Sequence, residues 1–69
     1  MSDSTYKIIE LVGTSPNSWD EAAKNAVEKA ARSLEDIRIA EVDQLDMKVE
    51  ENKVVAYRAR VKLSFKYKD

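Results

Sequence analysis

The stretch VAYRARVKLSFKY, residues 55–67, decides the fold, because apolar and polar side chains alternate along it. Successive side chains of a β-strand point to opposite faces, so the alternation predicts a strand with one apolar and one polar face. The apolar positions are all odd-numbered: Val55, Tyr57, Ala59, Val61, Leu63, Phe65 and Tyr67. The polar face carries a basic row that consists of Arg58, Arg60, Lys62 and Lys66.

A second long strand is predicted upstream of this one, beginning at Ile37. Most of its apolar residues share one parity: Ile37, Ile39, Leu45, Met47 and Val49. Val42 is out of step with them, and this slip predicts a β-bulge or bend. Residues 51–53, Glu-Asn-Lys, separate the two runs, and asparagine tolerates the left-handed backbone of a tight turn. A short hairpin turn and antiparallel pairing of the two strands follow.

An amphipathic helix is predicted before these strands. Its apolar residues recur at helical spacing: Trp19, Ala22, Ala23, Ala26, Val27, Ala30, Ala31 and Leu34. Ser18 and Glu21 have the spacing of a capping box at the helix start. The alanine-rich stripe allows close approach to a sheet, but it removes little apolar area from water.

The first element is a short strand from Tyr6 to Val12, followed by a predicted turn over residues 13–17, Gly-Thr-Ser-Pro-Asn. The expected order is therefore strand, helix, strand, strand. No linker or repeat divides the chain, and residues 1–69 are predicted to form a single domain.

At 69 residues, one small helix cannot cover two long strands. The chain has no cysteine for a disulfide and no histidine for an ordinary zinc cluster, so homo-oligomerisation is the remaining way to complete the core. The net charge of −1, with acids and bases interspersed, excludes strong nonspecific binding to nucleic acid. The polar N-terminus and the lack of an apolar run of about 20 residues predict a protein without a membrane span, and we expect it in the cytoplasm.

The residue types do not favour catalysis, because the usual proton shuttle, histidine, and the usual thiol nucleophile, cysteine, are both missing. A small enzyme that uses Arg58 or Lys62 on an anionic substrate stays an alternative. The basic row could bind a phosphate-bearing ligand, but ion pairs with acids of the second strand such as Asp46 and Glu50, across the sheet or across a subunit interface, are favoured. The acid cluster could instead offer oxygen ligands to calcium, or form salt bridges at an interface; it consists of Glu41, Asp43, Asp46 and Glu50.

The chain resembles the dodecins over nearly its whole length. The residues that carry the resemblance are Tyr6-Lys7-Ile8-Ile9-Glu10-Leu11-Val12-Gly13-Thr14-Ser15-Pro16, the alanine-rich helix, Ala40-Glu41-Val42 and Leu63-Ser64-Phe65. The resemblance implies an α+β fold of β-α-β-β order, in which a three-stranded antiparallel sheet wraps one helix. It also implies a homododecamer, a closed hollow shell that removes free strand edges.

The resemblance also bears on the ligand. In flavin-binding dodecins a tryptophan stacks on the flavin and a glutamine hydrogen-bonds it, but the equivalent positions here hold Ile39 and Arg58. The implied ligand pocket, formed by Ile39, Arg58 and Gln44, therefore lacks the aromatic stacking face, and flavin is not expected to bind. Residues 36–47, together with 18–19, resemble the calcium dodecins instead. Asp43 and Asp46 are the predicted calcium ligands, on charge and position alone.

These observations predict a non-enzymatic, homododecameric shell that binds or stores a small ligand or ion, calcium rather than flavin. Two alternatives within the same fold stay open. One is a flavin-buffering dodecin with an altered pocket, and the other is a purely structural assembly.

Overall fold

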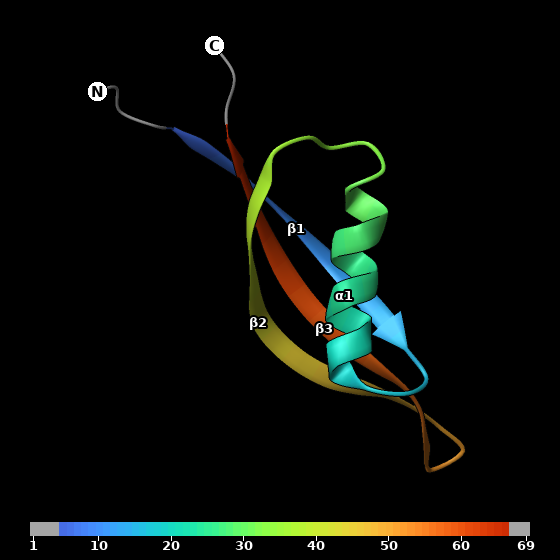
Figure 1. The fold of residues 1–69 in the computed structure, drawn as a ribbon. Coiled ribbons are helices and arrows are strands. Elements are labelled where there is room, and N and C mark those ends of the chain that lie inside the picture. The colour runs from blue at the N-terminus through green and yellow to red at the C-terminus, as the bar shows by residue number, and fades with distance from the viewer. Residues whose placement is uncertain (1–4, 67–69) are drawn as a thin grey trace.

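The computed structural model describes residues 5–66. Its elements are β1 (Tyr6–Ser15), α1 (Trp19–Ala30), β2 (Ile37–Glu50) and β3 (Lys53–Lys66). The strands form one antiparallel sheet in the order β1-β3-β2, and α1 packs on one side of it (Figure 1). The predicted fold class is confirmed. Tyr67, the last member of the predicted alternation, lies outside the described residues.

The central strand β3 has the two faces that its alternation predicts. Ala59, Val61 and Leu63 are buried and form the sheet side of the core. The helix side of the core is made of alanines only: Ala22, Ala26 and Ala30. Partly buried residues surround this cluster: Ile9, Leu11, Ala23, Val27, Leu34 and Ile37. Because every fully buried helix residue is an alanine, the helix lies close to the sheet and the core is thin.

The strand β1 is longer than predicted, because it continues to Ser15 instead of ending at Val12. Gly13, which we interpreted as the start of a turn, lies within the strand opposite Ala59. A Cβ atom on Gly13 would lie 2.0 Å from the carbonyl oxygen of Ala22 and 2.9 Å from the Cβ of Ala26. Glycine is therefore required by the close approach of β1 to the helix, and not by a turn.

The helix begins where the sequence places it, but its cap is built differently from a capping box. Ser18 is the N-cap, and its Oγ accepts a hydrogen bond from the Glu21 backbone N–H at 3.1 Å. The Glu21 carboxylate is used elsewhere: it accepts from the Ser15 hydroxyl, and from the Asn17 side-chain amide at 2.7 Å. Ser15 is 1% exposed, and its Oγ accepts from the Asn17 backbone N–H at 3.0 Å. These contacts join the end of β1 to the first turn of α1.

This polar network is expected to make stability sensitive to acid. The hydrogen bond from Ser15, followed by that from Asn17, holds the pKa of the Glu21 carboxyl below its ordinary value of 4.5. Because the pKa of Glu21 is lower in the folded than in the unfolded chain, the ionised carboxylate stabilises the fold above pH 4.5. This stability is lost as the pH falls through the pKa that Glu21 has in the folded chain. Glu21→Gln should therefore lower the unfolding midpoint at neutral pH and make its acid dependence shallower. Thermal unfolding of Glu21→Gln beside Glu28→Gln, an exposed control on the same helix, checks this; parallel pH curves would contradict it.

The helix ends earlier than the apolar stripe predicts. It stops at Ala30, with Ala31 as the C-cap, and residues 31–33 form a turn. Leu34 packs against the core from the connection to β2, so it continues the apolar contact without being helical. Within residues 5–66, no helix has the length and hydropathy that a membrane crossing requires.

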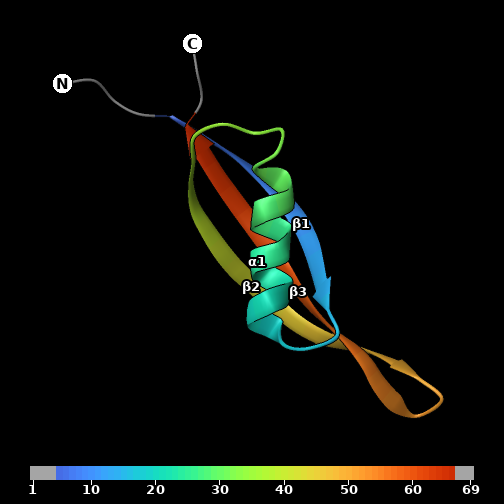
Figure 2. The same cartoon turned by 45° about the vertical axis from the view of Figure 1, so that its right-hand side comes forward.

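The β2–β3 hairpin has the predicted tight turn and the predicted irregularity. Glu51 and Asn52 form the turn with φ of 51° and 63°, while Lys53 already belongs to β3. The register shifts between Val42 and Gln44, as the phase slip indicates, and also near Ile37 and Lys48. The pairing of β1 with β3 stops at Tyr57, so the end of the hairpin pairs only with itself and projects past the helix (Figure 2).

The helix leaves a large part of the sheet uncovered. It packs mainly over β1 and β3, and β2 is exposed from Arg38 to Glu50. Exposed apolar side chains lie along β2 and the hairpin: Val42, Leu45, Met47, Val49, Val54 and Val55. Others lie on β1 and at the start of β2: Tyr6, Ile8, Val12 and Ile39. The single chain therefore has apolar surface that its own helix does not reach.

Candidate functional site

The strongest polar contact on the sheet is a two-point ion pair between Arg58 and Asp46. The two residues lie opposite each other on β3 and β2. The Arg58 Nε donates to Asp46 Oδ1 at 2.7 Å, and an Arg58 terminal nitrogen donates to Oδ2 at 2.8 Å. Both carboxylate oxygens of Asp46 are thus bound by one guanidinium. Such bidentate pairs are more specific in geometry than a lysine contact.

The pair holds both groups in their charged forms. The hydrogen bonds from Arg58 hold the pKa of the Asp46 carboxyl below its ordinary value, and Asp46 raises the pKa of Arg58. Both side chains are roughly half exposed, so solvent screens the attraction. Exposed ion pairs contribute little to stability, so the pair fixes the geometry of the two side chains more than it stabilises the fold.

Two further contacts join the basic row to β2. Arg60 donates to the Gln44 side-chain oxygen at 2.8 Å, and the Lys62 Nζ lies 3.8 Å from a carboxylate oxygen of Asp43. Asp43 lies in the register shift between Val42 and Gln44. The favoured interpretation of the basic row, cross-strand pairing with acids, is therefore confirmed for Asp46.

Within one subunit, Glu50 does not pair with the basic row, so the prediction of such a pair across the sheet is wrong, and pairing across a subunit interface stays a prediction. Glu50 lies near the hairpin turn, where its partner across the sheet is Lys53, and its carboxylate is 3.4 Å from the Nζ of Lys48. Lys48 and Glu50 are two positions apart on β2, so a neighbour on the same strand takes the place of the basic row.

The acid cluster does not form a complete metal site within one subunit. Among residues 5–66, no three or more carboxylates gather closely enough to hold a metal ion. Asp43 and Asp46 are separated on β2 by Gln44 and Leu45, and each already contacts a basic side chain. Calcium takes six to eight oxygen ligands, so the carboxylates suit calcium in chemical type but supply only part of a coordination shell.

The residues of the implied ligand pocket lie along the same two strands. Ile39 lies opposite Ser64 of β3, which lies opposite Ile8 of β1. Ile39 is 61% exposed and provides an aliphatic surface. Gln44 and Arg58 lie further along the sheet and are held by Arg60 and Asp46 respectively. One subunit thus places these three residues along the sheet without enclosing them.

Trp19 contributes to this region in a way that the sequence did not predict. Its indole N–H donates to the backbone carbonyl of Asp46 at 3.0 Å. Its ring meets Tyr57 edge to face, with ring centroids 5.1 Å apart. Trp19, the first residue of the predicted apolar stripe, thus packs against β3, and the hydrogen bond additionally fixes the backbone of Asp46 to the start of the helix. From the sequence, a tryptophan at the helix start indicates only that its indole N–H needs a hydrogen-bond acceptor. It does not indicate which residue provides that acceptor.

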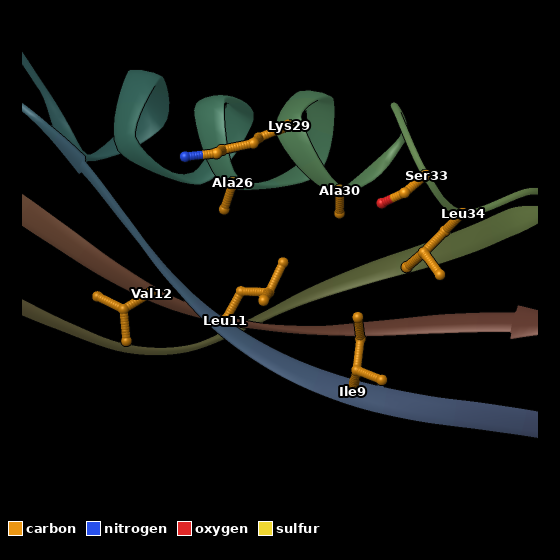
Figure 3. Close-up of a pocket in the computed structure, with 8 residues that line it drawn as sticks. All are labelled: Ile9, Leu11, Val12, Ala26, Lys29, Ala30, Ser33 and Leu34. Carbon is orange, nitrogen blue, oxygen red and sulfur yellow. The ribbon is translucent and has the colours of Figure 1, made fainter.

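A separate apolar groove of about 500 Å³ lies between the helix and β1. Ile9 and Leu11 point from β1 toward the helix, where Ala26 and Ala30 face them (Figure 3). The remaining lining residues are Val12, Lys29, Ser33 and Leu34. None of the predicted site residues lines this groove.

The architecture defines a class of small α+β proteins in which one helix lies on a three-stranded antiparallel sheet of order β1-β3-β2. Comparison with known proteins identifies the family. The dodecin family model matches residues 5–68, and the chain belongs to the dodecin family.

Individual relatives agree with this assignment. The chain is 46% identical to the calcium dodecin of Mycobacterium tuberculosis over 63 residues, which are 91% of this chain and 89% of the relative. The structure of dodecin from Streptomyces coelicolor matches with a TM-score of 0.92 at 36% identity, covering 100% of this chain and 99% of the other. A second structure, from Mycobacterium tuberculosis, matches with a TM-score of 0.84 at 45% identity and covers 94% of this chain and 93% of the other. That protein is a calcium-chelating antigen, calcium dodecin, with a novel calcium-binding site. Calcium dodecins are thus among the relatives of this chain, as the sequence resemblance predicts.

Proposed function

We propose that this chain is the subunit of a homododecameric, non-enzymatic shell that binds and stores calcium rather than flavin, in the cytoplasm. The observation that carries the assembly is the uncovered apolar surface of β2 and the hairpin. The calcium assignment is supported by the similarity to calcium dodecins and by the carboxylates of β2.

One subunit leaves apolar side chains of β2 exposed on the side of the sheet that the helix covers elsewhere. Leu45 lies opposite the buried Ala59, yet 52% of its surface is open because the helix does not extend over β2. Each Å² of such surface that a neighbour covers contributes about 25 cal/mol. The sheet also ends in two edge strands, β1 and β2, whose free backbone groups are a liability in a monomer. Association of copies into a closed oligomer covers the apolar side chains of β2 and pairs or covers the free backbone groups of the edge strands.

Two side chains, Ile39 and Arg58, do not suit flavin. Ile39 has no aromatic ring on which an isoalloxazine could stack. Arg58 donates through its Nε and one terminal nitrogen to Asp46, and its guanidinium carries donors only, so it does not supply the acceptor oxygen of a glutamine amide.

Asp43 and Asp46 are the carboxylates that we propose as calcium ligands. They offer hard oxygen ligands from two positions of one irregular strand that Gln44 and Leu45 separate. Two carboxylates are too few, so backbone carbonyls, water or a neighbouring subunit have to supply the remaining oxygens. Such a site would be complete only in the assembled shell.

Native mass spectrometry of the protein purified without added cofactor tests the proposal. We expect a twelve-subunit mass that gains calcium-sized increments when calcium is added. Flavin-sized increments would favour the flavin-buffering alternative, a dodecamer without any bound ligand would favour a purely structural shell, and a monomer would contradict the assembly.

Single substitutions test the metal ligands. Asp43→Asn and Asp46→Asn should each raise the calcium dissociation constant about tenfold, which equals about 1.4 kcal/mol. Asp20→Asn, which removes an exposed carboxylate from the first turn of α1, is the control and should leave it unchanged. Isothermal titration calorimetry measures all three. Unchanged affinity in both β2 variants would remove these residues from the site.

A further inference from the structure

The apolar groove between α1 and β1 lies open within one subunit. Ile9 and Leu11 form its floor on the sheet, Ala26 and Ala30 line it from the helix, and its volume is about 500 Å³ (Figure 3). Protein interiors leave few spaces larger than a water molecule. An open apolar groove of this size therefore indicates a surface that a partner covers.

The end of the β2–β3 hairpin has the opposite feature, apolar side chains that no part of its own subunit covers. Residues 53–56 of β3 pair with β2 but not with β1, and at about 3.3 Å per residue they extend the hairpin by about 13 Å beyond the third strand. Val49 and Val54 lie opposite each other in this extension and are 58% and 49% exposed. The hairpin end, residues 48–55, thus presents apolar surface beyond the reach of α1 (Figure 2).

We propose that the hairpin end of one copy of this chain occupies the groove between α1 and β1 of a neighbouring copy. This inference rests on the proposed function, because it names one contact of the proposed assembly. Groove and hairpin end are different surfaces, so the contact is head-to-tail: each copy inserts its hairpin into one neighbour and receives a hairpin from another. Head-to-tail contacts form rings when the rotation between copies closes, and a closed shell requires such closure.

A second copy covers more of the exposed surface than the other occupants that the groove could take. A small apolar molecule would fill the groove but leave the hairpin end in water. The chain's own ends, residues 1–4 and 67–69, carry only Met1 and Tyr67 as large apolar side chains. A hairpin in the groove also covers β1, an edge strand. The exposed apolar surface continues from the hairpin end along β2 to Met47 and Leu45, so a neighbour seated on the hairpin covers β2 as well.

The charges beside the two surfaces are complementary. Lys29 lines the groove, and Glu51 lies in the hairpin turn. Among residues 5–66, neither side chain belongs to an ion pair, since Lys48 contacts Glu50 and not Glu51. An entering hairpin that lays its valines in the groove brings Glu51 to Lys29 at the rim, where protein interfaces are polar.

Engineered disulfides test the contact directly, because the chain has no cysteine of its own. Ser33→Cys places a thiol in the groove, and Val54→Cys places one on the hairpin end. Within one subunit these positions lie beyond opposite ends of α1, a helix of about 18 Å, whereas a disulfide needs Cβ atoms about 4 Å apart. Oxidation of the assembled double variant should therefore link different copies. Since each chain carries both halves of the contact, a nonreducing gel should show a ladder of dimers and larger species.

Two controls accompany the double variant, and both mutated positions are exposed, so the variants should fold. Ser33→Cys and Val54→Cys alone should stay single chains on the gel. Lys24→Cys/Val54→Cys, with its first thiol on the exposed side of α1, should give no ladder. A double variant of wild-type oligomeric mass without a ladder would overturn the inference and leave the assembly intact. Dimers of Val54→Cys alone would show that hairpins meet each other, and would overturn it too. A monomeric wild-type chain would overturn the proposed assembly, and the inference with it.

Charge reversal gives an independent test of how the hairpin is seated. Lys29→Glu and Glu51→Lys each place like charges together at every contact, and each should raise the concentration at which half of the oligomer dissociates about threefold or more. The double variant Lys29→Glu/Glu51→Lys restores opposite charges and should return that concentration to within about twofold of wild type. Light scattering on a dilution series measures it. Additive weakening in the double variant would overturn the proposed seating of the hairpin.

Discussion

Gly13→Ala is expected to destabilise this protein more than any other single methyl addition on β1. The added Cβ would lie 2.0 Å from the Ala22 carbonyl oxygen, which belongs to the helix backbone and cannot rotate away. Either the helix moves away from the sheet or the strand bends. In both cases the close packing of the helix alanines on the sheet is lost. We expect a loss of about 3 kcal/mol or more, at the upper end of overpacking effects.

Urea unfolding of Gly13→Ala beside wild type measures this loss. Alanine also reduces the entropy of the unfolded chain, which would stabilise the variant by about 0.4–1 kcal/mol, so a net loss shows that the steric effect is larger. Thr14→Ala is the control, because the Thr14 side chain is exposed and its substitution should stay within about 0.5 kcal/mol of wild type. Equal unfolding midpoints for Gly13→Ala and wild type would contradict the close approach.

Leu45→Asp is expected to abolish assembly. In the single chain Leu45 is 52% exposed, so a carboxylate there would be well hydrated and would cost an isolated subunit little. In an assembly that covers β2, the same carboxylate would be buried without a partner, at a cost of several kcal/mol in every subunit. Closed symmetry repeats that cost at every equivalent contact.

Light scattering after size-exclusion chromatography measures the outcome for Leu45→Asp. We expect the wild-type chain and Leu45→Met, which keeps an apolar side chain of similar volume, to elute as the same oligomer. Leu45→Asp should elute as a smaller or unfolded species. A Leu45→Asp oligomer of wild-type mass would show that β2 stays open to solvent around Leu45. The subunit contact would then have to lie on the surface around Ile8 and Ile39.

The elements set by local patterns could be predicted from the sequence. The alternation of β3 correctly placed Ala59, Val61 and Leu63 on the buried side. The phase slip at Val42 correctly indicated a bulge, and Asn52 correctly indicated the tight hairpin turn. Each of these signals depends on residues within one element, so the rest of the molecule is not needed to interpret it.

The wrong predictions all depended on contacts between elements. Gly13 has the composition of a turn, but the backbone of a helix nine residues away decides its role. Glu21 has capping-box spacing, but Ser15 and Asn17 compete for its carboxylate. Leu34 continues a helical stripe although the helix has ended.

The candidate site could be predicted only in part, for the same reason. Opposite charges on β2 and β3 indicated ion pairs, but three register shifts decide which acid meets which base, and Asp46 rather than Glu50 meets Arg58. Asp43 and Asp46 as calcium ligands stay a prediction. Their remaining oxygen donors lie beyond one copy of the chain, and no pattern within a sequence specifies how copies meet.

The thin core described above also limits where a guest molecule could reside. Alanines of α1 lie directly against Ala59, Val61 and Leu63, so the centre of the chain is filled, and the apolar groove beside β1 is the space that remains between helix and sheet in residues 5–66. If the proposed calcium ligands Asp43 and Asp46 on exposed β2 need a neighbouring copy to complete the ion's shell, retention of the ion would follow the law of mass action for the copies themselves. Dilution of the chains below the concentration needed for association would then release the ion without any change in the ion concentration outside.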